Sequence, residues 1–357
     1  MNSNKISLTA ILTFLILFGA YYTPAQAPEW SKANSAAAAA RQRGDFAQAR
    51  KNYKEVVDIQ VKALGPDSPE VAVSLNNLAV TDQDLSLYPQ AEQDYLLALA
   101  ILEKNPAKKV STANTLDNLA ALYQDQGMDD KAEPLYLRAS IIWESLEKTR
   151  NSNEVISATA LAGIYHSQNL DAKAEPFYRK ALTLWREQGK LESAEAVEAM
   201  IHLADIYHFR SNNSEAAPLY ANVLAIWDKT GQTETPVAIA MQATLGEIYR
   251  TEGKYAQAEA LLTQALKSTE QLLGPNRLEV AASMNSLAIL YYCEGNYDAA
   301  APLYKRALAI RQANLGADNA VVLQTVQFYA AVLRQLGRGE DAQKLEAQAA
   351  GGGVSLL

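Results

Sequence analysis

A Leu-Ala pair returns along this sequence at an almost constant interval of 42 residues. The interval shortens to 41 only between Leu78 and Leu119. The pairs and their variants are Leu78-Ala79, Leu119-Ala120, Leu161-Ala162, Leu203-Ala204, Leu245-Gly246, Leu287-Ala288 and Tyr329-Ala330, and the same spacing leads back to Ala36-Ala37. We call the first residue of each pair the anchor of its repeat. A fixed period of this length indicates a stacked array of one supersecondary unit rather than a domain with a single core.

One repeat is clearest between residues 280 and 320. Apolar or small residues spaced 4, 3, 1 and 3 apart, from Val280 to Tyr291, predict a first helix over 280–294. The pair Gly295-Asn296 ends it, and a second amphipathic helix is predicted from 297 to about 313. Two such helices joined by a tight turn form an antiparallel helical hairpin. The sequence therefore predicts an all-α chain.

Other positions recur with the anchors. Thirteen residues after each anchor stands an alanine, at Ala49, Ala91, Ala132, Ala174, Ala216, Ala258, Ala300 and Ala342. Seventeen residues after it stands a tyrosine in six repeats, at Tyr53, Tyr95, Tyr136, Tyr178, Tyr220 and Tyr304. We call these the recurring alanines and the recurring tyrosines. An alanine that never varies predicts a close approach of two helices, because a larger side chain would hold them apart.

These residues resemble the tetratricopeptide repeat, and the longer period and the linkers resemble its kinesin light chain subtype. The inter-repeat turn is matched by residues 64–72 and 273–276, and the two helices by 75–79 and 301–308. The resemblance covers 33–350. It implies an α-solenoid of about eight helix-turn-helix units in a right-handed superhelix, whose first helices line a concave groove that binds peptides or partner proteins. Bacterial secreted proteins with this repeat are a closer comparison than a cytosolic motor subunit.

The segment 1–25 is typical of a secretory signal peptide. Lys5 supplies a positive charge, and the apolar run over 6–20 is shorter than the roughly 20 residues of a transmembrane helix. Small residues permit cleavage after Ala25 or after Ala27, and the proline that would follow the second cut favours Ala25. We therefore expect a secreted or periplasmic protein, with an uncut N-terminal membrane anchor as the alternative.

The expected organisation after the signal peptide is a linker at 26–32, the solenoid at 33–350 and a flexible tail at 351–357. The formal net charge is −8, without blocks of Lys or Arg. This argues against nucleic acid or an anionic membrane surface as the main partner. Cys293 is the single cysteine, so no internal disulfide is possible.

Groove residues are predicted at two residues before, two after and five after each anchor. Asparagine and glutamine carry donors and acceptors, so they can bracket an extended peptide backbone without selecting its sequence. The resemblance implies this role for Asn34, Asn76 and Asn285, and the alternative is that they are solvated helix residues. The predicted peptide-binding groove contains Asn34, Asn76, Asp117, Gln124, His166, Asp205, His208, Glu247, Arg250, Asn285 and Tyr292.

These positions hold no lysine, which argues against the clamp that co-chaperone repeats use for C-terminal carboxylates. Asp117, Asp205 and Glu247 suggest instead a ligand with some positive charge. His166 and His208, with Asp205, could in principle bind zinc. Adjacent first helices lie roughly 10 Å apart, which favours polar groove residues without a metal.

Three tryptophans, Trp143, Trp185 and Trp227, occupy one equivalent position in successive repeats, near the end of the predicted second helix. Exposed stacked indoles could hold sugars, but this position faces the next repeat and predicts an inter-repeat core. Phosphate-binding glycine loops and zinc-protease motifs are absent from the sequence. We therefore expect no enzymatic activity, no metal and no cofactor.

The predicted function is a non-enzymatic scaffold that binds a protein or peptide outside the cytoplasm. The first alternative is an accessory or regulatory subunit that docks a secreted enzyme. A metal- or sugar-binding receptor is a weaker alternative. No membrane association is expected after the signal peptide is removed.

Overall fold

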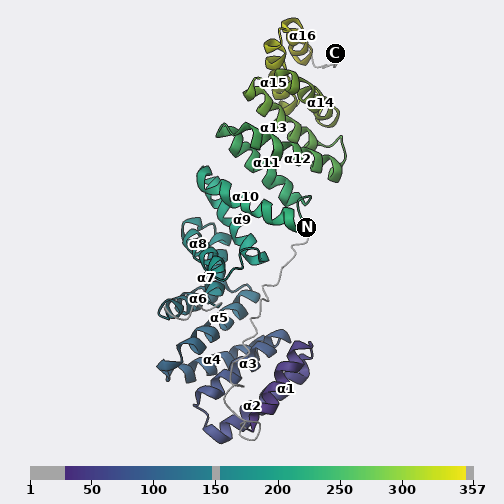
Figure 1. Ribbon diagram of the computed structural model, residues 1–357. Helices are drawn as coiled ribbons and strands as arrows, with labels where there is room; N and C mark the ends of the chain where they lie inside the picture. The colour runs from purple at the N-terminus through teal and green to yellow at the C-terminus, as the bar shows by residue number, and fades with distance from the viewer. Residues whose placement is uncertain (1–28, 147–152, 351–357) are drawn as a thin grey trace. The chain divides into compact units, whose positions relative to one another are not determined.

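The computed structural model describes residues 29–146 and 153–350. Over these residues the chain forms sixteen α-helices and one short 3-10 helix, with no strand (Figure 1). The all-α prediction is confirmed. The predicted signal peptide at 1–25 and the predicted tail at 351–357 lie outside the described residues. None of the described helices is both long enough and apolar enough to cross a membrane.

The helices follow one another as eight pairs. The first four pairs are α1 (Trp30–Gln42) and α2 (Phe46–Leu64), α3 (Pro69–Asp84) and α4 (Tyr88–Glu103), α5 (Lys109–Asp125) and α6 (Asp129–Glu144), and α7 (Glu154–Ser167) and α8 (Asp171–Glu187), with the 3-10 helix η1 (Pro106–Lys108) before α5. The other four are α9 (Ala194–Phe209) and α10 (Asn213–Thr230), α11 (Pro236–Thr251) and α12 (Tyr255–Leu273), α13 (Leu278–Glu294) and α14 (Tyr297–Leu315), and α15 (Ala320–Gln335) and α16 (Gly339–Ala350). The helix pair predicted from 280 to 313 is α13 and α14.

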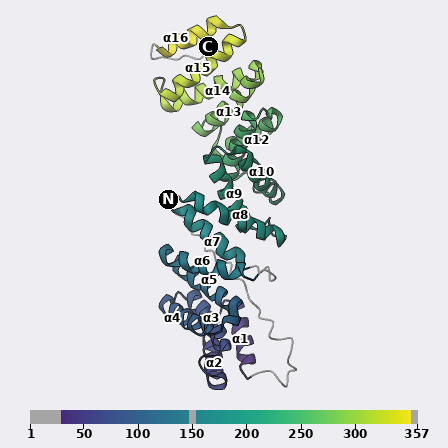
Figure 2. The same ribbon diagram turned by 90° about the vertical axis from the view of Figure 1, so that its left-hand side faces the viewer.

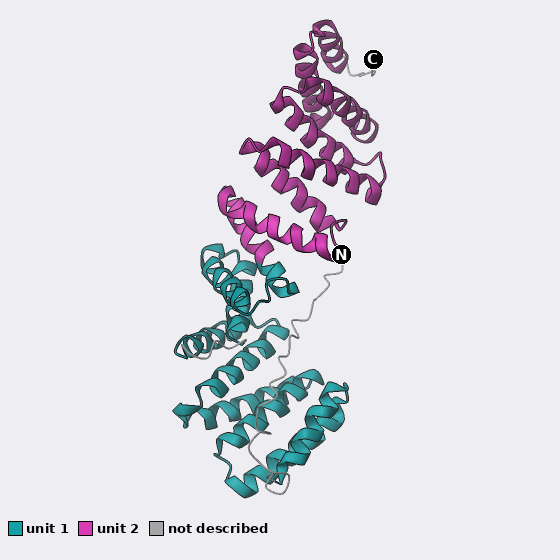
Figure 3. Ribbon diagram, viewed as in Figure 1, with its two compact units in different colours: residues 1–199 teal, residues 200–357 magenta. Residues whose placement is uncertain are grey.

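The chain divides into two compact units, residues 1–199 and 200–357, and the division falls within α9 (Figure 3). Within each unit the pairs stack in sequence order (Figures 1 and 2). In the first unit α2 packs on α3, α4 on α5 and α6 on α7, and in the second α10 packs on α11, α12 on α13 and α14 on α15. Within each unit, the repeats joined by these contacts stack on their neighbours in the sequence, as in a repeat array.

The turn inside each pair adopts a left-handed backbone conformation. Glycine occupies it in five pairs, and three pairs have another residue there with a φ near 58°. These residues are Gly44, Ser86, Gly127, Asn169, Ser211, Gly253, Gly295 and Gly337. Glycine reaches this region without steric cost, and asparagine tolerates it better than most residues. The tight turn brings each second helix back along its first.

The predicted core positions are buried. All eight of the recurring alanines are 0% exposed, and the six recurring tyrosines are at most 6% exposed. Trp143 and Trp185 are also buried, at 3% and 5% exposure, whereas Trp227 is half-buried. The prediction that these tryptophans are core residues is confirmed for Trp143 and Trp185, whose buried rings present no sugar-binding platform.

The α11–α12 pair departs from this pattern at two positions that contact each other. Gly246 replaces the alanine of the Leu-Ala pair, and Leu262 replaces the recurring tyrosine. A Cβ atom added at Gly246 would lie 2.8 Å from both Cγ and Cδ2 of Leu262. Gly246→Ala is therefore expected to destabilise the protein by about 1 kcal/mol, because overpacking of about 1–3 kcal/mol outweighs the gain in helix propensity.

Adding Leu262→Tyr to Gly246→Ala is expected to recover this loss, since Ala120 and Tyr136 stand together at the same positions in α5 and α6. Urea denaturation of the wild type, both single variants and the double variant measures the coupling. Additive effects of the two changes would show that the side chains at 246 and 262 do not compensate each other.

Candidate functional site

The eleven predicted groove residues all lie on first helices of the pairs, and we call the solvent side of these helices the first-helix face. Asn34 and Tyr292 are exposed, and eight others are half-buried. The half-buried residues are Asn76, Gln124, His166, Asp205, His208, Glu247, Arg250 and Asn285. Asp117 is only 4% exposed. Ten of the eleven therefore keep contact with solvent.

Amide side chains connect successive first helices in the first unit. Asn118 Nδ2 on α5 donates to Asn76 Oδ1 on α3 at 3.0 Å. Asn153 Nδ2, just before α7, donates to Asn114 Oδ1 on α5 at 2.5 Å. Sequence reasoning singled out Asn76 but missed its partner. The sequence did contain a signal for this partner. An asparagine stands directly before the anchor in two successive repeats, at Asn77 and at Asn118.

Buried tyrosines hold several of these polar groups in place. Tyr95 OH donates to Gln83 Oε1 at 3.2 Å, and Tyr136 OH donates to Gln124 Oε1 at 2.9 Å. In both cases a recurring tyrosine on the second helix bonds to the predicted groove position on the first helix of its own pair. The core tyrosines therefore orient the side chains of the first-helix face as well as filling the space between helices.

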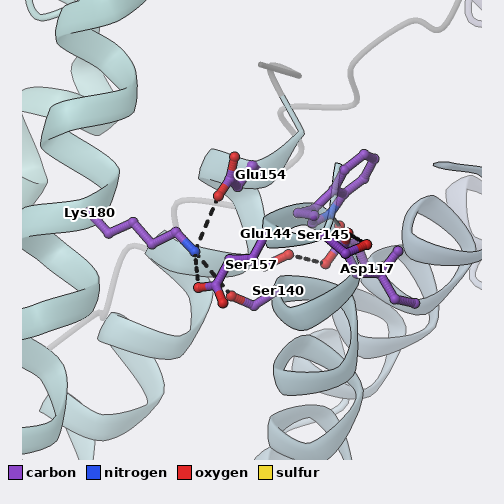
Figure 4. Close-up of polar contacts among 9 residues, drawn as sticks. Asp117, Ser140, Glu144, Ser145, Glu154, Ser157 and Lys180 are labelled. Atoms are coloured by element: carbon purple, nitrogen blue, oxygen red, sulfur yellow. Dashed lines mark hydrogen bonds and ion pairs between the residues drawn. The ribbon is translucent and has the colours of Figure 1, made fainter. Parts of the chain in front are cut away.

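Asp117 is an interior group rather than an exposed groove carboxylate (Figure 4). Trp143 Nε1 on α6 donates to Oδ2 at 2.9 Å, and Ser157 Oγ on α7 donates to Oδ1 at 2.5 Å. Burial raises the pKa of Asp117 to about 7, and the hydrogen bonds from Ser157 and Trp143 oppose this rise. The next repeat covers the carboxylate, so Asp117 joins three helices and does not face a ligand.

A lysine-centred cluster lies beside Asp117 in the same unit (Figure 4). Lys180 Nζ on α8 lies 2.6 Å from Glu144 Oε1 on α6 and 3.2 Å from Glu154 Oε1 on α7. It also donates to Ser140 Oγ at 3.4 Å. Helices α6, α7 and α8 thus meet at one ammonium group, which stabilises the same junction as Asp117.

The predicted acidic groove residues of the second unit are also engaged within the protein. Tyr220 OH on α10 donates to Asp205 Oδ1 on α9 at 2.5 Å. Arg250 Nε on α11 lies 2.8 Å from Glu247 Oε2, and Arg250 Nη1 lies 3.7 Å from Cys293 Sγ on α13. A cationic ligand could pair with either carboxylate only by displacing a contact within the protein.

The histidines have local partners as well. His166 Nδ1 lies 2.8 Å from Asp171 Oδ1, and His208 Nδ1 lies 3.2 Å from Asn213 Oδ1. Within residues 29–146 and 153–350 no group of three or more His, Cys, Asp or Glu side chains is arranged to hold a metal ion. His166 and His208 thus each contact the start of the second helix of their own pair.

Two aromatic side chains, Tyr292 on α13 and Phe328 on α15, lie on the first-helix face of the second unit, each against a ring on α14. The rings of Tyr292 and Tyr297 meet edge-on with centroids 5.4 Å apart, and those of Tyr304 and Phe328 stack at 6.1 Å. Tyr292 and Phe328 are 37% and 38% exposed. Phe328 directly precedes the anchor Tyr329, a position that the sequence analysis did not include in the groove.

Comparison with known proteins agrees with this architecture. The tetratricopeptide repeat family matches residues 31–104, 111–187, 195–271, 237–313 and 279–350. No curated protein matches the chain.

Among solved structures, BtubC (BKLC) from P. vanneervenii is 25% identical, with a TM-score of 0.46, covering 70% of this chain and 89% of that chain. A putative kinesin light chain from Podosopora anserina with nearly identical TPR-like repeats is 23% identical, with a TM-score of 0.42, covering 57% and 96%. The apo form of RapI is 14% identical, with a TM-score of 0.50, covering 80% and 98%, and shares the fold. Because the family matches nearly all of residues 31–350, the chain belongs to the tetratricopeptide repeat family.

Proposed function

We propose that this protein is a non-enzymatic scaffold that binds an extended peptide or a segment of a partner protein on its first-helix face, outside the cytoplasm. Tetratricopeptide repeat proteins generally mediate protein–protein interactions. The residues of this chain supply the more specific part of the proposal, which concerns the ligand's backbone.

The amide pair formed by Asn76 and Asn118 carries the proposal. Their mutual hydrogen bond uses one donor of Asn118 and the carbonyl oxygen of Asn76. Within the described residues, the Nδ2 group of Asn76 and the Oδ1 atom of Asn118 make no other hydrogen bond, and both side chains are half-buried. A free amide NH2 group beside a free amide oxygen matches the C=O and N–H groups of an extended peptide backbone.

The location outside the cytoplasm rests on the signal peptide predicted over residues 1–25. Intact-mass analysis of protein recovered from its native compartment tests it. We expect Gln26 or Pro28 as the first residue. A mature protein that starts at Met1 would contradict removal of the leader and favour an N-terminal anchor.

The binding proposal is tested by crosslinking the mature chain to its partner in native extracts and measuring the partner's affinity for purified variants. Asn76→Ala and Asn118→Ala are each expected to weaken binding about fivefold or more, because losing a hydrogen bond to a buried backbone group costs about 1–3 kcal/mol. The matched control is Gln93→Ala on α4, an exposed amide on a second helix, which should leave affinity unchanged. If Asn76→Ala and Asn118→Ala bind the partner as tightly as the control Gln93→Ala does, the partner binds elsewhere on the protein.

A further inference from the structure

In the described part of the chain, two glycines lie inside first helices, Gly163 on α7 and Gly246 on α11. Packing explains Gly246, because an added Cβ would lie 2.8 Å from the Leu262 side chain. At Gly163 an added Cβ would meet no atom within 4 Å, and the backbone there is ordinary α-helix. Neither the backbone conformation nor the packing of the described residues therefore requires a glycine at 163.

Gly163 stands two residues after its anchor, a predicted groove position on the first-helix face, and it is half-buried. The other seven repeats carry a side chain at this position, namely Ala38, Val80, Ala121, Asp205, Glu247, Ile289 and Ala331. Glycine in a helix interior destabilises a protein relative to alanine, because its backbone loses more conformational freedom on folding. The glycine therefore costs stability and leaves the backbone of α7 open to a molecule from outside the chain.

Helix α5, which stands between α3 and α7, presents a free donor on the same face. Gln124 is half-buried, and its Oε1 accepts a hydrogen bond from Tyr136 OH at 2.9 Å. This bond fixes which end of the amide is occupied, and the Nε2 group makes no hydrogen bond within the described residues. Gln124 therefore offers an oriented donor that suits the C=O group of a peptide.

The helices that carry these groups are neighbours in the first unit (Figures 1 and 2). Asn76 on α3 accepts from Asn118 on α5, and Asp117 on α5 accepts from Ser157 on α7. Packed helices lie roughly 10 Å apart, and an extended chain advances about 3.3 Å per residue. A peptide that crosses from α3 to α7 therefore needs about six residues.

We propose that the peptide site continues from the Asn76–Asn118 pair across α5 onto α7, where the main chain of the bound peptide lies directly against Gly163. Peptide C=O groups accept hydrogen bonds from Asn76 Nδ2 and Gln124 Nε2, and a peptide N–H donates to Asn118 Oδ1. At Gly163 the missing side chain lets the two backbones come into contact. This inference rests on the proposed function and names the path and the minimum length of its ligand.

A displayed library of random twelve-residue peptides, selected on the chain from Gln26 onwards, supplies the probe. Selected peptides are synthesised, and one that Asn76→Ala weakens is used. Gly163→Ala is expected to bind this peptide about tenfold more weakly, because its methyl group takes the space of the peptide main chain. Gly163→Val, with a larger side chain, should weaken the peptide further.

The same Gly163→Ala variant is expected to unfold at a higher urea concentration than the wild type. Alanine favours a helix over glycine, and its Cβ meets nothing in the protein. A gain in stability together with a loss of affinity distinguishes a ligand contact from a structural role. The matched control is Gly339→Ala at the start of α16, where an added Cβ also meets no atom within 4 Å, and it should leave the affinity unchanged.

The outcomes separate the two proposals. If Gly163→Ala binds an Asn76-dependent peptide as tightly as Gly339→Ala does, the contact at α7 is overturned and peptide binding stands. A Gly163→Ala variant less stable than the wild type would also overturn it, because the space above the glycine would then be used within the protein. If no selected peptide depends on Asn76, the proposed function fails, and the path over Gly163 fails with it.

Discussion

Asp117→Asn is expected to remove most of the pH dependence of stability from the junction of α5, α6 and α7. Burial raises the folded-state pKa of Asp117 to about 7, above the ordinary value of 3.8. The folded state therefore holds this proton more tightly than the unfolded state does. The contribution to stability is greatest below pH 3.8, falls as the pH rises towards 7, and levels off above that.

The expected size of this effect follows from the two pKa values. One pKa unit corresponds to about 1.4 kcal/mol, so the wild type should lose about 3 kcal/mol of stability between pH 5 and pH 8 through this residue. Asparagine keeps the shape and an acceptor for Trp143 or Ser157 without a titratable charge. Asp117→Asn should therefore be nearly flat over this range, and more stable than the wild type at pH 8.

Hydrogen exchange of amides in α5 and α7 at pH 5 to 8, corrected for intrinsic rates, measures the local free energy of opening. The ionisable neighbours on the packed helices are Tyr136 and Glu144 on α6, Glu154 on α7 and Lys180 on α8, and none of them bonds to Asp117. The control is Asp130→Asn, an exposed aspartate on α6, which should follow the wild-type profile. An unchanged profile in Asp117→Asn would assign the pH dependence to another group.

The repeat period predicts the fold because each helix pair depends on residues that are near in the sequence. The recurring alanine and the recurring tyrosine lie in the same hairpin as their anchor, so a helical spacing rule places them in the core. The burial of Ala132 and Tyr136 confirms this. The family resemblance extends the same reasoning to all eight pairs.

The site was less predictable because its contacts join residues far apart in the sequence, some of them in the next repeat. Asp117 occupies a groove position by spacing, but its donors come from Trp143, 26 residues later, and Ser157, 40 residues later. In the second unit, a contact between repeats is marked by a break in the tryptophan pattern. Arg311 on α14 stands where three earlier repeats have tryptophan, and its Nη1 donates to Thr325 Oγ1 on α15 at 2.6 Å.

The junctions also share a hydrogen bond that the spacing rules did not reveal. At three junctions, a tyrosine near the end of one first helix donates to a glutamate near the start of the preceding second helix, at equivalent positions in the repeats. The pairs are Tyr123 with Glu92 at 2.7 Å, Tyr165 with Glu133 at 2.8 Å and Tyr291 with Glu259 at 2.7 Å. Between α2 and α3 the same two positions hold Arg50 and Asp82, which form an ion pair.

Arg50→Met is expected to destabilise the α2–α3 junction by about 3 kcal/mol, because Asp82 is only 1% exposed and removing its partner leaves a buried carboxylate without a counter-charge. Asp94 on α4 adds to the cost. Burial and then the charge of Asp82 raise the pKa of Asp94 to about 6, against the opposing charges of Lys54 and Arg50. Urea denaturation at pH 8, above the raised pKa of Asp94, measures the loss.

Replacing the ion pair by the arrangement of the other junctions is expected to recover most of this loss. The triple variant Arg50→Glu, Asp82→Tyr and Asp94→Leu installs the tyrosine and glutamate together with the apolar residue that stands as Leu135 and Leu303 in other repeats. It replaces the buried carboxylate of Asp82 and the half-buried carboxylate of Asp94 by groups that the stacked helices accommodate elsewhere in this chain. A triple variant no more stable than Arg50→Met would show that the α2–α3 junction differs from the others in its backbone packing, beyond the identity of the paired side chains.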